Sequence, residues 1–229
     1  MTQHDALYRA ICAEPDEDTP RLIFADLVEE EGDPARAAFI RSQIALAHVT
    51  EYDPVYVSAK QLTPDALNGW MMTEALPKPV PAGCSWNTFE FRRGFPWITR
   101  LLSLASFVAD GDALFGAAPI QALDADPNER LDLGALAKCP HLKKIRRLEF
   151  SHGRFGANAI TRLGDSANAK GLVELAFGFD SITAAGLEAL ALSDVFPRLE
   201  SLELRMSAIP PALLADSLAA ADRPGHLGQ

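Results

Sequence analysis

The sequence predicts an α/β protein in which a small N-terminal helical module precedes a series of stacked strand–helix units. Three observations carry this prediction: a strand-like phrase that returns at a fixed step, helical spacing of apolar residues after each phrase, and helix start and stop signals near the N-terminus. The chain has 229 residues, which is enough for one large domain or two small ones.

The strand-like phrase occurs three times. The octets LEFSHGRF, LAFGFDSI and LELRMSAI begin at Leu148, Leu175 and Leu202, so each begins twenty-seven positions after the one before it. We call this spacing the repeat step. It also relates Ile145, Leu172 and Leu199, then Phe155, Ile182 and Ile209, and then Ile160, Leu187 and Leu214. Each unit alternates as a half-buried strand does and continues with apolar residues at helical spacing. Because one strand and one helix cannot bury their own apolar faces, we expect neighbouring units to share one core.

These units closely resemble leucine-rich repeats in their longer, helix-containing form, since that family combines L-x-x-L-x-L with a fixed period of about 20–29 residues. The resemblance implies a short solenoid with parallel strands on its concave side and helices on its convex side. A weaker upstream unit places Ile120, Leu123 and Ala125 on the same pattern. The family usually carries Asn three residues after the last strand position. Gly153, Asp180 and Ser207 stand there instead, so we expect less regular turns.

Helix signals predict three short helices within residues 1–49. The first is expected at about residues 3–13. Thr19 is expected to cap the second, with Pro20 as its first residue and Gly32 at its end. Asp33-Pro34 then starts the third helix. The expected inward residues are Leu7, Ala10 and Ile11 in the first helix, Leu22, Ile23, Leu27 and Val28 in the second, and Phe39, Ile40, Ile44 and Ala47 in the third.

This N-terminal stretch, DEDTPRLIFADLVEEEGDPARAAFIRSQ, resembles the bacterial repeat-companion domain, a short module found ahead of repeat segments. The match covers about residues 5–47. Two positions depart from the family pattern: Leu27 stands where Trp is usual, and Ala38 where an acidic residue is common. Such proteins often carry an aromatic Arg-Gly-Phe segment where the repeats start, here FEFRRGFPWITRL at Phe89–Leu101. The resemblance implies a link from module to repeats and implies no catalytic residues.

Charged residues of the module leave two interpretations open. Arg21, Asp26, Asp33 and Arg41 either form ion pairs and caps that hold the helices together or provide a polar recognition face. Residues 1–49 contain ten acidic residues and four arginines, a balance of −6. This charge is either a solvated helical face or an acidic surface that docks a basic partner.

We divide the chain into a helical module at 1–49, a helix with a Pro-rich linker at 50–88, and a repeat arc at 89–229. Within the arc, degenerate units span about 89–144 and regular repeats span 145–218. Residues 63–76 are expected to be helical, and the prolines of PKPVPAGCSW indicate a linker or wrapping loop. Residues 104–119 are expected to form the helix of a degenerate repeat.

No sequence motif points to catalysis, a cofactor or a metal. Phosphate-loop, zinc-protease and hydrolase motifs are absent, and Cys139 with His141 is too short a spacing for a zinc site. The widely spaced Cys12, Cys84 and Cys139 suit free thiols, with Cys139 in a small buried position. We therefore expect a cytoplasmic protein without cofactors that is not an enzyme.

Charge and hydropathy also bear on the class of partner. The formal net charge of −10 disfavours nucleic acid, and no apolar run reaches the ~18 residues of a membrane span. What remains is the concave strand face, on which a partner protein or peptide would bind. The candidate partner-binding residues are Asp124, Asp126, Arg147, Glu149, His152, Glu174, Phe179, Glu203, Arg205 and Met206. Phe179 and Met206 are either exposed anchors or part of the turn core.

Three function classes remain open from sequence. The first is an interaction module that binds through the concave face. The second is an accessory or scaffold subunit that presents a peptide substrate to a modifying enzyme. The third, catalysis by this chain itself, would need a pocket that clusters acid, His and Cys side chains. The partner and the oligomeric state are left open.

Overall fold

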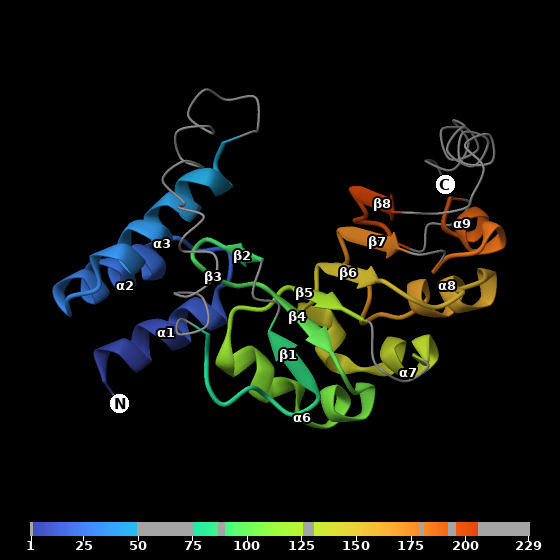
Figure 1. The fold of residues 1–229 in the computed structure, drawn as a ribbon. Coiled ribbons are helices and arrows are strands. Elements are labelled where there is room, and N and C mark those ends of the chain that lie inside the picture. The colour runs from blue at the N-terminus through green and yellow to red at the C-terminus, as the bar shows by residue number, and fades with distance from the viewer. Residues whose placement is uncertain are drawn as a thin grey trace. The chain divides into compact units, whose positions relative to one another are not determined.

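The computed structural model describes residues 2–49, 76–86, 90–125, 131–178, 181–191 and 196–205. Within these ranges the chain is a mixed α/β protein with seven α-helices and a mostly parallel, open sheet of six strands in the order β1-β4-β5-β6-β7-β8 (Figure 1). Residues 63–75 of the helix expected at 63–76, and the repeat positions Ile209 and Leu214, lie outside the described residues.

Two compact units divide the chain. Unit 1 comprises residues 1–99 and 110–121, and unit 2 comprises residues 100–109 and 122–229. These bounds differ from the domains drawn from sequence, because the segment after residue 89 groups with the N-terminal helices up to Thr99.

Unit 1 begins with three helices, as predicted: α1 (Gln3–Ala13), α2 (Thr19–Glu30) and α3 (Pro34–Ala47). Gly32 follows α2 with φ +97, a left-handed conformation that suits glycine. The Asp33 side chain caps α3 by accepting a 3.0 Å hydrogen bond from the Arg36 N–H. The expectation for Thr19 was wrong: Asp18 precedes the first helical residue, and its side chain makes no capping hydrogen bond.

The buried face of α2 agrees with the prediction at Val28 and differs from it at Leu22 and Ile23. Leu22 and Ile23 are 41% and 45% exposed, whereas the helix buries Arg21, Phe24, Ala25 and Val28. Because a helix turns by about 100° per residue, the buried positions form one stripe and positions 22 and 23 fall on the other side. In the third helix Phe39, Ile40 and Ile44 are buried as expected, but Ala47 is exposed.

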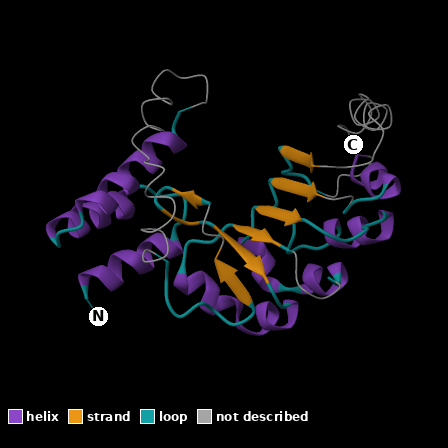
Figure 2. Cartoon of the chain, in the orientation of Figure 1, coloured by secondary structure: helices purple, strands orange, loops and turns teal. Residues whose placement is uncertain are grey.

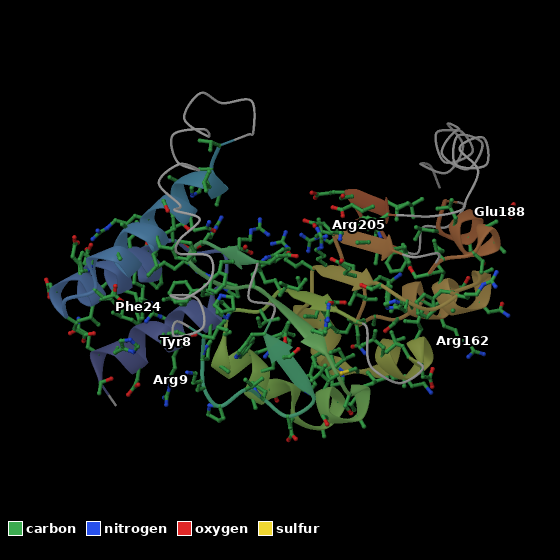
Figure 3. All side chains as sticks on the ribbon, viewed as in Figure 1. Tyr8, Arg9, Phe24, Arg162, Glu188 and Arg205 are labelled. Carbon is green, nitrogen blue, oxygen red and sulfur yellow. The ribbon has the colours of Figure 1, made fainter. Side chains whose placement is uncertain are left out.

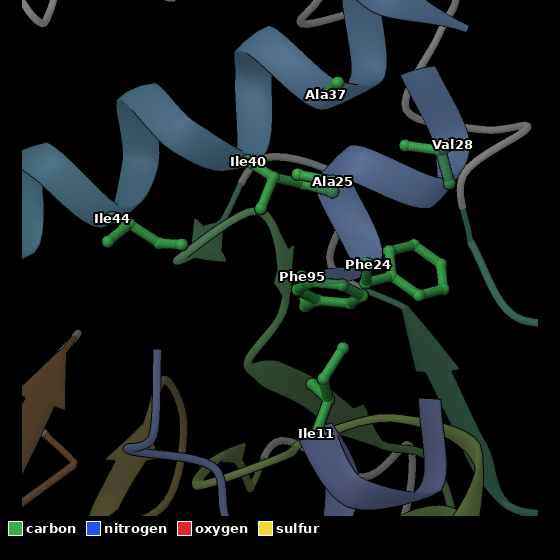
Figure 4. Close-up of a cluster of buried hydrophobic side chains, with 8 residues drawn as sticks. All are labelled: Ile11, Phe24, Ala25, Val28, Ala37, Ile40, Ile44 and Phe95. Atoms are coloured by element: carbon green, nitrogen blue, oxygen red, sulfur yellow. The ribbon is translucent and has the colours of Figure 1, made fainter. Parts of the chain in front are cut away.

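The core of unit 1 is completed by a hairpin distant in sequence. Strands β2 (Phe91–Arg92) and β3 (Phe95–Pro96) pair antiparallel, and Phe95 enters the cluster formed by the three helices (Figure 4). The Phe24 and Phe95 ring centroids lie 5.5 Å apart in an edge-to-face arrangement. Gly94 has φ +82, and a Cβ there would lie 2.7 Å from the Ile40 Cα. The close approach of Ile40 therefore explains why glycine stands at position 94 of the Arg-Gly-Phe segment.

The sequence predicts a linker or a wrapping loop for the Pro-rich segment. This segment ends in strand β1 (Cys84–Trp86), which is the first strand of the six-stranded sheet. The indole N–H of Trp86 donates a 2.9 Å hydrogen bond to the Pro77 carbonyl, so the strand and the loop before it are joined. Strand β4 (Ile98–Leu101) is its neighbour in the sheet. Helix α6 (Leu104–Ala117) follows as expected and leaves helical geometry at Asp110.

Unit 2 consists of strands and helices that alternate along the chain. The strands are β5 (Ala122–Asp124), β6 (Arg147–Phe150), β7 (Glu174–Gly178) and β8 (Ser201–Arg205), and they pair in parallel in chain order. The helices are α7 (Leu133–Lys138), the 3₁₀ helix η2 (Pro140–Lys144), α8 (Ala157–Gly164) and α9 (Ala184–Ala191). Helices α7, α8 and α9 lie in the same order along one side of these strands (Figure 2).

The strand register follows the period seen in the sequence. Leu148 pairs with Leu175 and Leu175 with Leu202, so one repeat step moves a position to the neighbouring strand. Leu123 pairs with Leu148 at the shorter step of the upstream unit. Leu123, Leu148 and Leu175 are at most 1% exposed. Cys139 is 1% exposed, as expected for a small buried position.

A buried serine supplies hydrogen bonds between two successive strand–helix units of unit 2. Ser181 is completely buried, and its hydroxyl donates a 2.9 Å hydrogen bond to the Phe150 carbonyl. The Ser181 carbonyl accepts a 2.8 Å hydrogen bond from the Phe155 N–H. Ser181 therefore joins the turn after β7 to the unit that contains β6.

Candidate functional site

Six of the ten candidate residues lie on one face of the strands of unit 2. The register pairs Asp124 with Glu149 and Arg147 with Glu174. Along each strand these charged residues alternate with buried leucines and phenylalanines. We call the set formed by Arg100, Asp124, Arg147, Glu149, Glu174, Glu203 and Arg205 the charged strand face. Asp126, Phe179 and Met206 lie outside the described residues, and His152 is in an exposed turn after β6.

Arg147 is the centre of the charged strand face. Its guanidinium donates hydrogen bonds to Glu174 at 2.9 Å, to Glu149 at 3.2 Å and to Glu203 at 3.4 Å. Only 11% of its side chain is exposed. Burial alone would lower the pKa of Arg147, but the hydrogen bond to Glu174 and the nearby carboxylates raise it. Arg147 therefore remains a cation that holds three strands together.

Arg205 extends the network across β7. Its guanidinium donates a 2.7 Å hydrogen bond to Glu149, two strands away, and also pairs with Glu203. The residue between Glu149 and Glu203 in the register is Ala176, which is 1% exposed. The small side chain of Ala176 leaves room for the Arg205–Glu149 hydrogen bond, which crosses β7 at this point.

Arg100 of β4 is a member of the charged strand face that the sequence did not identify. Its Nε donates a 2.8 Å hydrogen bond to Asp124. Asp124 was predicted to face a partner, but its side chain is 5% exposed, whereas that of Arg100 is 50% exposed. Asp124 therefore positions Arg100, and the arginine is the group that solvent reaches. An alignment of the β4 sequence with the strands of the regular repeats would have indicated that Arg100 belongs to this face.

The charged strand face is nearly neutral as a whole, with three arginines and four carboxylates, a balance of −1. Burial alone would raise the pKa of Glu203, but the hydrogen bond from Arg205 and the charge of Arg147 lower it. The side chains of Glu174, Glu203 and Arg205 are 34%, 38% and 50% exposed. The outer ends of these paired side chains are thus the groups of the network that reach solvent.

The charged residues of the N-terminal module mainly serve its own structure. Arg41 pairs with Asp26 at 2.6 Å and with Glu29 at 2.7 Å, and Asp33 caps α3. Arg21 is 2% exposed and donates a 2.8 Å hydrogen bond to the Glu17 carbonyl. Asp26 and Arg41 thus form an ion pair and Asp33 forms a cap, while Asp26 and Glu29 remain exposed beyond these contacts.

Across the part of the chain that the structure describes, no three His, Cys, Asp or Glu side chains are placed to share a metal ion. In the same ranges no helix combines the length and the hydropathy of a membrane span. Burial raises the pKa of the Cys84 and Cys139 thiols, which makes both weak nucleophiles at neutral pH.

Comparison with known proteins found no matching family model, no matching curated protein and no matching solved structure. The resemblances to the repeat-companion domain and to leucine-rich repeats therefore rest on the residues quoted for them.

Proposed function

We propose that this chain is a cytoplasmic, non-catalytic interaction protein in which a repeat-companion module precedes a short leucine-rich-repeat arc. The chain order of β5–β8, the constant repeat step in the register of β6, β7 and β8, and the matching order of α7, α8 and α9 support the repeat arc. A stack of this kind presents its strands on one side and its helices on the other.

One observation carries the binding function: the strand side bears an ordered ion network whose outer groups reach solvent. Glu174, Glu203 and Arg205 are held in place by Arg147 and Glu149. Ordered charged groups lose less conformational entropy on binding than free side chains do. The face therefore suits an extended segment of a partner protein whose charges alternate, so that a cation meets Glu174 or Glu203 and an anion meets Arg205.

A pair of neutral substitutions tests this proposal. Glu174→Gln with Arg205→Gln removes one charge of each sign and retains Arg147 with Glu149 and Glu203. The matched control is Arg162→Gln with Glu188→Gln on the helices α8 and α9 (Figure 3). A direct charge reversal at Glu203 and Arg205 is less suitable, because it would set like charges against Arg147 and Glu149.

The experiment is affinity capture with the tagged full chain from its native cytoplasm, followed by an affinity measurement with the purified partner. We expect the strand-face variant to weaken binding at least about tenfold, or ~1.4 kcal/mol, and the helix-side control to leave it unchanged. Equal affinities for the native chain and the strand-face variant would place the binding surface elsewhere. Capture of a modifying enzyme together with its peptide substrate would replace simple binding by the accessory role.

A further inference from the structure

The outward side of α2 combines apolar and acidic side chains. Leu22 and Ile23 are adjacent and are 41% and 45% exposed. On the same side of the helix lie Asp26, Glu29 and Glu30, all exposed. We call these five residues the outer face of α2. Leu22 and Ile23 project about 100° apart, with Asp26 and Glu30 between them, so this side of the helix presents apolar and acidic groups together.

The buried side of α2 includes a charged residue. The helix buries Arg21 beside Phe24, Ala25 and Val28, while Leu22 and Ile23 remain partly exposed on the other side. Burial, together with the nearby charge of Arg93, lowers the pKa of Arg21 to about 10. Its guanidinium lies 5.4 Å from the centre of the Phe95 ring, which offsets part of the cost of burying the charge. A buried guanidinium on the same helix as two exposed aliphatic side chains departs from the usual distribution of residue types, and such departures are expected at functional sites.

The charge of the outer face indicates the chemistry of its occupant. Arg41 pairs with Asp26 and Glu29, so three carboxylates face one guanidinium, a balance of −2. Asp26 and Glu29 remain 67% and 48% exposed despite these pairs. An anionic membrane surface would be repelled by this charge. A helix with apolar residues on one side and lysines or arginines beside them would cover both features at once.

We propose that the outer face of α2 binds a basic amphipathic helix of a partner protein. Leu22 and Ile23 contact its apolar stripe, while Asp26, Glu29 and Glu30 attract the flanking cations. This site lies within unit 1 and shares no residue with the charged strand face of unit 2.

A synthetic amphipathic helix built from Leu and Lys is the probe. Its binding to the full chain is measured by fluorescence anisotropy at low and high salt, and hydrogen exchange locates the protected amides. Leu22→Ser with Ile23→Ser is the test variant. Leu102→Ser with Val108→Ser is the matched control, since those two residues are 37% and 42% exposed elsewhere in the chain. Both variants alter exposed positions, and an unchanged thermal midpoint confirms that each is folded.

We expect the peptide to protect α2, the test variant to weaken binding at least tenfold, the control to bind as the native chain does, and salt to weaken binding. A version of the peptide with Glu in place of Lys should not bind. The proposal is overturned if the native chain does not bind the Leu/Lys peptide, if both variants weaken binding equally, or if the Glu peptide binds as well. It is also overturned if sedimentation shows that the native chain self-associates through Leu22 and Ile23, since a second copy would then occupy the face.

Discussion

The two units of this protein bury their apolar residues by different rules. In unit 2 the buried positions recur at one step, so Leu148 and Leu175 are equivalent residues of successive layers. In unit 1 the core has no period: Ile11, Phe24 and Ile40 come from three helices, and Phe95 comes from a hairpin much further along the chain. A periodic core is visible in the sequence. A composite core requires knowledge of which distant segments meet.

The largest expected effect concerns the composite core. Phe95→Ala should destabilise unit 1 by about 3–5 kcal/mol, because the side chain is 1% exposed and three helices cannot close over the space it leaves. Native-state hydrogen exchange resolves the two units separately. Exchange should accelerate in α2 and α3. If the amides of β6 and β7 accelerated equally, the two cores would behave as one cooperative unit and the comparison would fail.

The next largest loss of stability is expected from a substitution in the periodic core of unit 2. Leu175→Ala should cost about 2–5 kcal/mol, since Leu175 lies between Leu148 and Leu202 and is 1% exposed. The measurement is hydrogen exchange of β6, β7 and β8, with exposed Leu102→Ala as a control of the same chemistry. The control should stay within about 0.5 kcal/mol of the native chain. A loss of that small size for Leu175→Ala would mean that the strand phase is wrong.

The smallest expected effect comes from the charged strand face, where the Glu203 carboxylate contributes to the stability of the fold. The pKa of Glu203 is lowered below its ordinary value of 4.5, so its carboxylate stabilises the fold above that pH and the contribution is lost as the pH falls through the folded pKa. Because the side chain is 38% exposed, solvent screening limits this contribution to less than about 1 kcal/mol. Glu203→Gln should therefore reduce the loss of stability between neutral and acidic pH.

Thermal unfolding of unit 2 at neutral pH and below pH 4.5 measures this difference. The native chain should lose more stability on acidification than Glu203→Gln does. An identical pH dependence in the two proteins would show that Arg147 and Arg205 do not stabilise the Glu203 carboxylate in solution.

The charged strand face was only partly predictable. The alternation of each strand placed Arg147, Glu149, Glu174, Glu203 and Arg205 on one face, because side chains alternate across a strand. Their pairing was not predictable, since it joins residues up to 56 positions apart. Arg100 was missed because it belongs to a strand outside the regular repeats, and the burial of Asp124 follows from that missed partner.

The sequence by itself determined what depends on local physics or on an exact repeat. Caps and turn residues set the start of α3 at Asp33 and the end of α2 before Gly32, and the constant repeat step set the register of β6 with β7 and of β7 with β8. Only the tertiary structure decided which side of α2 is buried. Phe24, Ala25 and Val28 face inward because Phe95, brought back by the hairpin at Gly94, packs into the same cluster. Helical periodicity in α2 alone permits either side, so a distant segment determined that Leu22 and Ile23 face outward.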